Sequence, residues 1–203
     1  MYTALRATSK TLIAYLRQCF EEDLYLKQFF KSSDGGNMTV SLNTPHEMTL
    51  NQAEGLSVWL YRLVRDEERL NAPPERVNMT QLRRAPLPVR LHYLITPIVN
   101  TKTDVTPETE QAILGKVLQG FYEHPTFRGV DLQDDLSGTL SELTVRLESL
   151  SLDEITKVYD ALERSYQLSL SYEVGVVYIY ASSEPEKGAP VRTVMPDSGI
   201  IVS

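Results

Sequence analysis

The sequence predicts an α+β fold in which a single, mostly antiparallel sheet packs one face against an N-terminal helix and two further helices. Three segments, 86–96, 141–149 and 166–180, alternate between apolar and polar residues, which is the pattern of half-buried strands. A fourth segment, 56–64, is apolar on nearly every position and is typical of an interior strand. Stretches with apolar residues at helical spacing separate these strands along the chain.

The segment from Tyr166 to Tyr180 has the clearest strand pattern, because every even-numbered position in it is apolar or aromatic. At about 3.3 Å per residue it would be about 50 Å long, well above the usual strand length. Gly175 therefore predicts a bulge or bend. Beyond it Val177 and Ile179 make the second face apolar, so we expect the chain itself or a partner to cover both faces there.

The first two predicted helices are amphipathic. The first covers about the first twenty residues, and Cys19 lies on its apolar stripe, which favours a buried thiol over a nucleophile. The second runs to Tyr122 from an N-cap at Thr106, with proline at its first position. Gly115 and Gly120 weaken this helix, so close packing against a neighbour is a reason for glycine there.

A third helix is predicted to start at a capping box formed by Ser151 and Glu154. It follows the strand at 141–149 and leads directly into the strand that starts at Tyr166. The residues expected to face the core are Leu143, Val145 and Leu147 in the strand and Leu152, Ile155, Tyr159 and Leu162 in the helix.

The segment from Arg65 to Ala85 is polar and rich in proline and arginine, and it predicts a long irregular loop. Its arginines include Arg76, Arg83 and Arg84. Two interpretations remain open: a solvated loop, or a docking surface for an acidic partner.

Two regions are expected in the chain. Residues 1–181 form the α+β domain, and residues 182–203 form a flexible C-terminal tail rich in Ser, Glu, Pro, Lys and Gly. The tail contains an apolar group, Ile200, Ile201 and Val202. These residues are expected either to add to the sheet edge of another subunit or to be disordered.

Composition excludes several classes of protein. The net charge of -7 and the lack of a basic stripe argue against a nucleic-acid binder. A single cysteine excludes an intramolecular disulfide and favours synthesis in a reducing compartment. No stretch has the roughly 18 apolar residues of a membrane span, so we expect a soluble protein, made in the cytoplasm, with no membrane partner.

The sequence has no recognisable catalytic, cofactor-binding or metal-binding motif. His46, His92 and His124 lie far apart, without the spacing of a zinc site. The acidic group at 131–135 lacks the ligand pattern of an EF-hand, so a solvated loop is favoured. No catalytic, cofactor or metal residue is therefore predicted. An alternative is an enzymatic or small-molecule-binding domain that uses a cleft beside His92.

Three segments carry a resemblance to a known family: PLPVRLHYLIT at 86–96, LGKVLQGFYEHP at 114–125 and YQLSLSYEV at 166–174. In their order and spacing they resemble the cap, or tail-terminator, proteins of extracellular contractile injection systems, which are phage-tail-like particles of the anti-feeding-prophage and virulence-cassette type. VWLYRL at 58–63 extends the similarity, which covers roughly residues 1–180.

The resemblance implies a structural protein and not an enzyme. Such proteins form a six-subunit ring on the last layer of inner tube and sheath, at the end distal to the baseplate, and couple the two. It implies self-association into a homohexamer, sheath and inner-tube partners, and a cytoplasmic protein that becomes part of the particle. A monomeric adaptor that binds a partner through residues 65–85 is a further alternative. The residues we expect at the subunit, tube or sheath interfaces are Arg76, Arg83, Arg84, Tyr178, Ile179, Tyr180, Ile200, Ile201 and Val202.

Overall fold

The computed structural model describes residues 2–70, 72–78, 80–99, 107–182 and 184–187. The α-helices in this part of the chain are α1 (Ala4–Glu22), α2 (Lys27–Phe30), α3 (Pro45–Leu50), α4 (Pro107–Glu123) and α5 (Leu152–Ala161). The strands are β1 (Thr39–Ser41), β2 (Gly55–Arg65), β3 (Glu75–Asn78), β4 (Gln81–Arg83), β5 (Leu87–Ile98), β6 (Thr126–Arg128), β7 (Glu142–Glu148), β8 (Leu170–Ile179) and β9 (Glu186–Lys187). None of the described helices is both long and apolar enough to cross a membrane.

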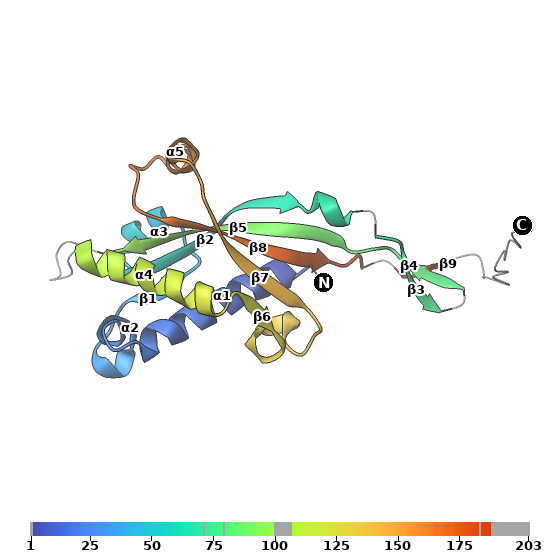
Figure 1. The fold of residues 1–203 in the computed structure, drawn as a ribbon, viewed down its shortest axis with the longest axis horizontal. Helices are drawn as coiled ribbons and strands as arrows, with labels where there is room; N and C mark the ends of the chain where they lie inside the picture. Colours follow the sequence, from blue (N-terminus) through green and yellow to red (C-terminus); the bar gives the residue numbers. More distant parts are fainter. Residues whose placement is uncertain (1, 71, 79, 100–106, 183, 188–203) are drawn as a thin grey trace, which may run out of the picture.

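The main sheet has six strands in the order β1-β2-β5-β8-β7-β6 (Figure 1). Every pair in it is antiparallel except β1 and β2, which run parallel. The long strand β5 lies in the middle and pairs with β2 on one side and β8 on the other. The α+β class and the mostly antiparallel sheet predicted from the sequence are confirmed.

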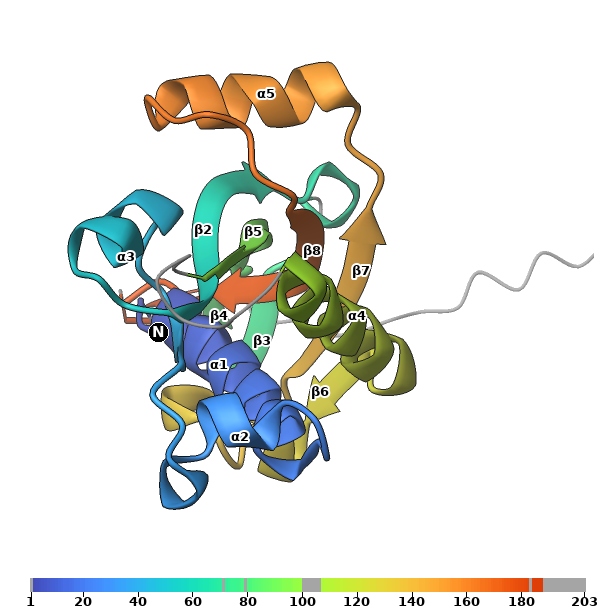
Figure 2. The same ribbon diagram turned by 90° about the vertical axis from the view of Figure 1, so that its left-hand side faces the viewer.

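The core lies on one face of this sheet, against α1 and α4. Figure 2 shows both helices on the same side of the strands. Leu91, Tyr93 and Ile95 alternate along β5 towards them and are fully buried. The Tyr93 hydroxyl lies 2.7 Å from Ser9 Oγ on α1, which satisfies both groups inside the core.

Glycine at position 120 allows α4 to approach α1 closely. The Tyr15 hydroxyl donates a hydrogen bond to the Gly120 carbonyl at 2.7 Å, and a Cβ on residue 120 would lie 3.4 Å from Cys19 Sγ. Close packing is thus confirmed for Gly120 but not for Gly115, where a Cβ would meet open space. Cys19 is half-buried, and burial raises the pKa of its thiol, as expected of an unreactive cysteine.

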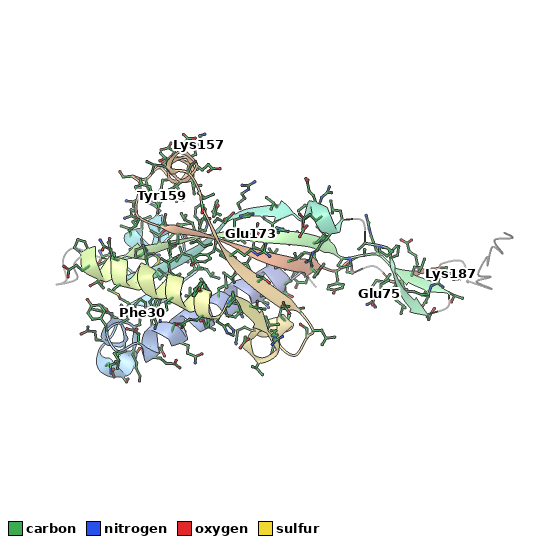
Figure 3. The ribbon with its side chains drawn as sticks, in the orientation of Figure 1. Phe30, Glu75, Lys157, Tyr159, Glu173 and Lys187 are labelled. Atoms are coloured by element: carbon green, nitrogen blue, oxygen red, sulfur yellow. The ribbon has the colours of Figure 1, made fainter. Side chains whose placement is uncertain are left out.

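Helix α5 lies on the opposite face, which differs from the predicted arrangement of all helices on one face. The predicted capping box is present, since the Ser151 hydroxyl accepts from the Glu154 amide and the Glu154 carboxylate accepts from the Ser151 amide. The buried residue of α5 is Tyr159, which contacts Thr96 Oγ1 at 3.2 Å and lies between the helix and the sheet (Figure 3). Leu152 is 68% exposed, so the predicted apolar face is wrong at that position.

The segment from Arg65 to Ala85 is not an irregular loop. It holds a short 3₁₀ turn and the hairpin of β3 and β4, and β9 joins β4 to form a second, three-stranded sheet. The Asn78 side chain accepts from the Thr80 amide at 3.0 Å and so supports the turn. We call β3, β4 and β9 the arm, and it extends beyond the main sheet along the long axis (Figures 1 and 3).

The predicted tail begins inside the arm. Glu186 and Lys187 pair with Leu82 and Gln81 of β4. Residues 188–203 lie outside the described part of the chain, so the predicted division at residue 181 stays a prediction.

Strand β8 is shorter than predicted, because it starts at Leu170 and not at Tyr166. The Tyr166 ring instead packs edge-on against Tyr159, with ring centroids 5.7 Å apart. The predicted irregularity at Gly175 is confirmed. Gly175 and the following residue together oppose the single residue Arg90, and a Cβ on residue 175 would lie 3.4 Å from Arg90 Cγ.

Candidate interaction surfaces

The predicted interface residues lie in the arm and at the adjacent end of β8. Arg76 is on β3, opposite Leu82, and Arg83 ends β4, opposite Glu75. All described residues of β3 are exposed, and so is Arg83. Arg84 lies in the link from β4 to β5. The remaining predicted residues, Ile200, Ile201 and Val202, are outside the described part of the chain.

A groove at the base of the arm brings three of these residues together. It has a volume of about 780 Å³, and its lining includes Arg84, Ile179 and Tyr180. Ile179 pairs with Leu87 across β8 and β5, and Leu87 is 46% exposed although it begins the central strand. The groove therefore combines a guanidinium with exposed apolar surface, a combination that is enriched at protein interfaces.

A second groove opens where β7 separates from β8. β7 pairs with β8 only between Thr144, opposite Gly175, and Glu148, opposite Ser171. The residues of β7 before Thr144 pair with β6 alone. The resulting groove, of about 620 Å³, is lined by Tyr178 and Tyr180, among others.

The end of β8 is covered by the chain itself on one face. Val177 is buried, whereas Tyr178 and Ile179 are half-buried and Tyr180 is 43% exposed. Arg69 Nη1 donates to the Tyr178 hydroxyl at 2.9 Å and holds that ring in place. The sequence leads us to expect both faces of this end to be covered, and cover of the second face by a partner stays a prediction.

A charged cluster that the sequence did not reveal surrounds Arg90, which lines the second groove together with Glu173. Arg90 Nε donates to Asp66 Oδ2 at 3.1 Å and its Nη1 donates to Glu173 Oε1 at 2.8 Å, while Nη2 lies 3.6 Å from Glu68 Oε2. Burial lowers the pKa of Arg90, but the hydrogen bonds to Glu173 and Asp66 outweigh it and raise the pKa overall. The available sequence signal was a lone arginine between Val89 and Leu91 in an apolar strand.

His92 belongs to a buried network beside this cluster. Its Nδ1 lies 2.9 Å from Glu148 Oε1, and the Ser171 hydroxyl donates to Glu148 Oε2 at 2.7 Å. Among the described residues, His92, Glu148 and Glu173 bring possible metal-ligand atoms within 4.8 Å of one another. Glu173 already binds Arg90, whose charge opposes a metal ion at this point.

The same geometry argues against the alternative cleft. His92 is 5% exposed and lines none of the grooves described above. The acidic loop is also structured: Asp134 accepts from Lys10 at 2.9 Å and from Arg6 at 2.9 Å, which ties it to α1. Asp134 thereby anchors this surface loop to a helix.

Exposed apolar surface beside an arginine, as in the groove at the base of the arm, is a common composition of surfaces that bind other proteins. Residues 7–193 match the family model described as the Pvc16 N-terminal domain, and the chain belongs to this family. The resemblance to cap and tail-terminator proteins inferred from the sequence is confirmed.

Two solved structures share the fold. One is described as the sheath/tube terminator of PVC, an extracellular contractile injection system, in its extended state; the identity is 17%, the TM-score 0.61, and the match covers 97% of this chain and 64% of that one. The other is the tube-terminating cap of the anti-feeding prophage, with 19% identity, a TM-score of 0.59, and coverage of 97% and 60%. This chain thus spans less than two thirds of their length. A search of curated protein sequences found no significant match.

Proposed function

We propose that this protein is a structural cap of a contractile injection particle. Copies of the chain assemble into a closed ring of six, which terminates the inner tube and sheath at the end distal to the baseplate and couples them. The similarity to a sheath/tube terminator and to a tube-terminating cap supports the structural role. The chain acts as a binding component and not as an enzyme. It assembles in the cytoplasm of the producing bacterium and then remains part of the particle.

The arm is the structural feature that best supports assembly into a ring. Its strands β3, β4 and β9 form a separate small sheet, and all described residues of β3 and β9 are exposed. Ordering these exposed strands costs conformational entropy that little burial within the chain offsets. Contact with a neighbouring subunit supplies the missing burial. A closed ring needs two unlike contact faces on each subunit, and the arm at one end of the long axis supplies one of them.

We assign the predicted residues to these faces as follows. Arg76, Arg83 and Arg84 contribute to the arm side, and Tyr178, Ile179 and Tyr180 contribute to the grooves at its base. The domain of residues 1–181 forms the body of the ring, and residues 182–203 add contacts between subunits, through β9 in the arm and through Ile200, Ile201 and Val202.

The test is the mass of the purified protein by light scattering, with negative-stain images of the same fractions. A ring of six chains of 23.0 kDa has a mass of about 138 kDa. Six-fold rings, formed alone or after mixing with tube and sheath subunits encoded beside this protein, support the proposal. A monomer that stays monomeric after mixing refutes it and favours an adaptor.

A further inference from the structure

Within the described part of the chain, the C-terminal half of strand β7 has no pairing partner on the side away from β8. On that side β6 pairs with β7 only from Glu142 to Thr144, and the ladder ends with a hydrogen bond from the Val145 amide to the Pro125 carbonyl at 2.8 Å. Pro125 has no N–H, so it returns no hydrogen bond to the Val145 carbonyl. Alternate residues of a strand direct their backbone groups to the same side, so Leu147 directs its N–H and C=O to this edge as well.

This edge therefore presents two acceptors and one donor, the geometry that allows another strand to add to a sheet. The two carbonyls belong to Val145 and Leu147, and the donor is the Leu147 amide.

An apolar groove lies directly beside the edge, between α4 and β7. Its volume is about 610 Å³, and none of its lining side chains carries a charge at neutral pH. Leu147 is 53% exposed and Tyr122 is 88% exposed, so the prediction that Leu147 faces the core is wrong. Phe121 and Tyr172 form the buried part, and burial raises the pKa of Tyr172 to about 12. We call the β7 edge and this hollow the acceptor groove.

We propose that the acceptor groove binds residues Gly199–Val202 of a second copy of this chain as an added strand. This inference rests on the proposed function, since it names one of the contacts between neighbouring subunits. The segment Gly-Ile-Ile-Val is uncharged, and its three β-branched residues favour extended structure. In a strand, Ile200 and Val202 lie on the same face, so the backbone pairs with β7 while one apolar face fills the groove.

The reach of the chain favours a second copy over the same molecule. Lys187 pairs with Gln81 in the arm, and Gln81 precedes Tyr93 by twelve residues. Tyr93 and Leu147 lie level with each other, because both pair with Tyr172 of β8. At about 3.3 Å per residue, the twelve residues from Gln81 to Tyr93 place Lys187 about 40 Å from Leu147 along the strands, and two strand spacings of about 4.8 Å separate them sideways. Ile200 is thirteen residues beyond Lys187 and reaches at most about 47 Å.

A chain that bound its own groove would thus be stretched almost to its limit. Such a conformation loses nearly all of the entropy of the connecting residues, a cost that is avoided when a neighbour's groove lies nearer to the arm.

The test is disulfide cross-linking in the full chain, with Cys19→Ser as background. Chains carrying Leu147→Cys are co-expressed with larger, tagged chains carrying Ile200→Cys, then oxidised with copper phenanthroline in air. We expect mixed dimers at least ten times as abundant as with Val130→Cys in place of Leu147→Cys. Val130 is an apolar residue that is 93% exposed and lies outside the groove, so it measures random collision.

Mixed dimers no more abundant than in the Val130→Cys control overturn the inference. A chain carrying both Leu147→Cys and Ile200→Cys provides a second reading, because a linked monomer as its sole product assigns the segment to its own groove and also overturns it. Light scattering on the same samples tests the six-subunit ring independently of the strand addition. Six-fold rings without the mixed disulfide refute the inference alone, and mixed disulfides without rings refute the ring alone.

Discussion

Replacing Arg90 by methionine should destabilise the protein by about 3 kcal/mol. Arg90 binds Asp66 and Glu173, which lie on either side of β5, and the Asp66 side chain is only 1% exposed. Without the guanidinium, the Asp66 carboxylate still accepts a hydrogen bond from the Glu68 amide at 3.1 Å. Methionine preserves most of the apolar stem, so the change reports mainly the buried charge.

The magnitude follows from how deeply each partner is buried. Removing one member of a buried ion pair costs about 3–5 kcal/mol, because the other charge is left without compensation. The Arg90 side chain is 24% exposed, so water reaches part of the site and the lower end of this range applies. For a protein of this size, about 2–4 °C of Tm corresponds to each kcal/mol, which predicts a fall of about 6–12 °C.

The assay is thermal and urea unfolding of the wild type and three variants. Asp66→Asn together with Arg90→Met should be more stable than Arg90→Met alone, because it removes the more deeply buried of the two carboxylates that lose the guanidinium. Arg62→Met, an exposed arginine on β2, is the matched control and should change the free energy of unfolding by less than about 0.5 kcal/mol. A fall in Tm below about 3 °C for Arg90→Met, or a double variant no more stable than the single one, would refute the reasoning.

Three further predictions concern other parts of the molecule. Charge reversal of Arg83 and Arg84 to glutamate should weaken ring or particle assembly with the fold intact, as seen in light scattering and negative-stain images. Ser151→Ala should lower the free energy of unfolding by about 1 kcal/mol through loss of the α5 cap, measured by urea unfolding. The hydrogen bond from Lys10 lowers the pKa of Asp134, so this carboxylate stabilises the fold above its ordinary pKa and loses that effect as pH falls through the lowered one. The stability difference between wild type and Asp134→Asn should therefore vanish in strong acid.

The arm-arginine and Ser151 predictions each have a matched control variant. Glutamate at Arg17 and Lys31, both exposed and away from the arm, should leave assembly unchanged. Normal capped particles from the Arg83 and Arg84 variant would remove the arm arginines from the mechanism. Ser149→Ala, at an exposed serine outside the helix, should be neutral, and an equal loss at both serines would contradict the capping argument. For Asp134, a difference that persists at pH 2 would exclude an ionic origin.

Prediction from the sequence succeeded where the signal was local. Helix α5 was located from its capping box, and the bulge from Gly175, because each depends on residues close together in the chain. Helix α3 was missed although it carries the same signal, since Thr44 and Glu47 form a capping box with Pro45 between them. The arm was missed for a physical reason: the β3 sequence Glu-Arg-Val-Asn is exposed on both faces and shows no apolar alternation.

The candidate surfaces depend on where strands stop, and this the sequence could not predict. The groove lined by Tyr178 and Tyr180 exists because β7 pairs with β8 only from Thr144 onwards, and the acceptor groove exists because β6 ends its pairing at Pro125. Both are properties of neighbours that are distant along the chain. The sequence by itself determined the class of fold, the long amphipathic elements and the family, since these follow from periodicity, caps and ordered motifs. Only the tertiary structure decided which strand edges lack a partner and which apolar side chains lie beside them, because pairing and burial are set by contacts between distant segments.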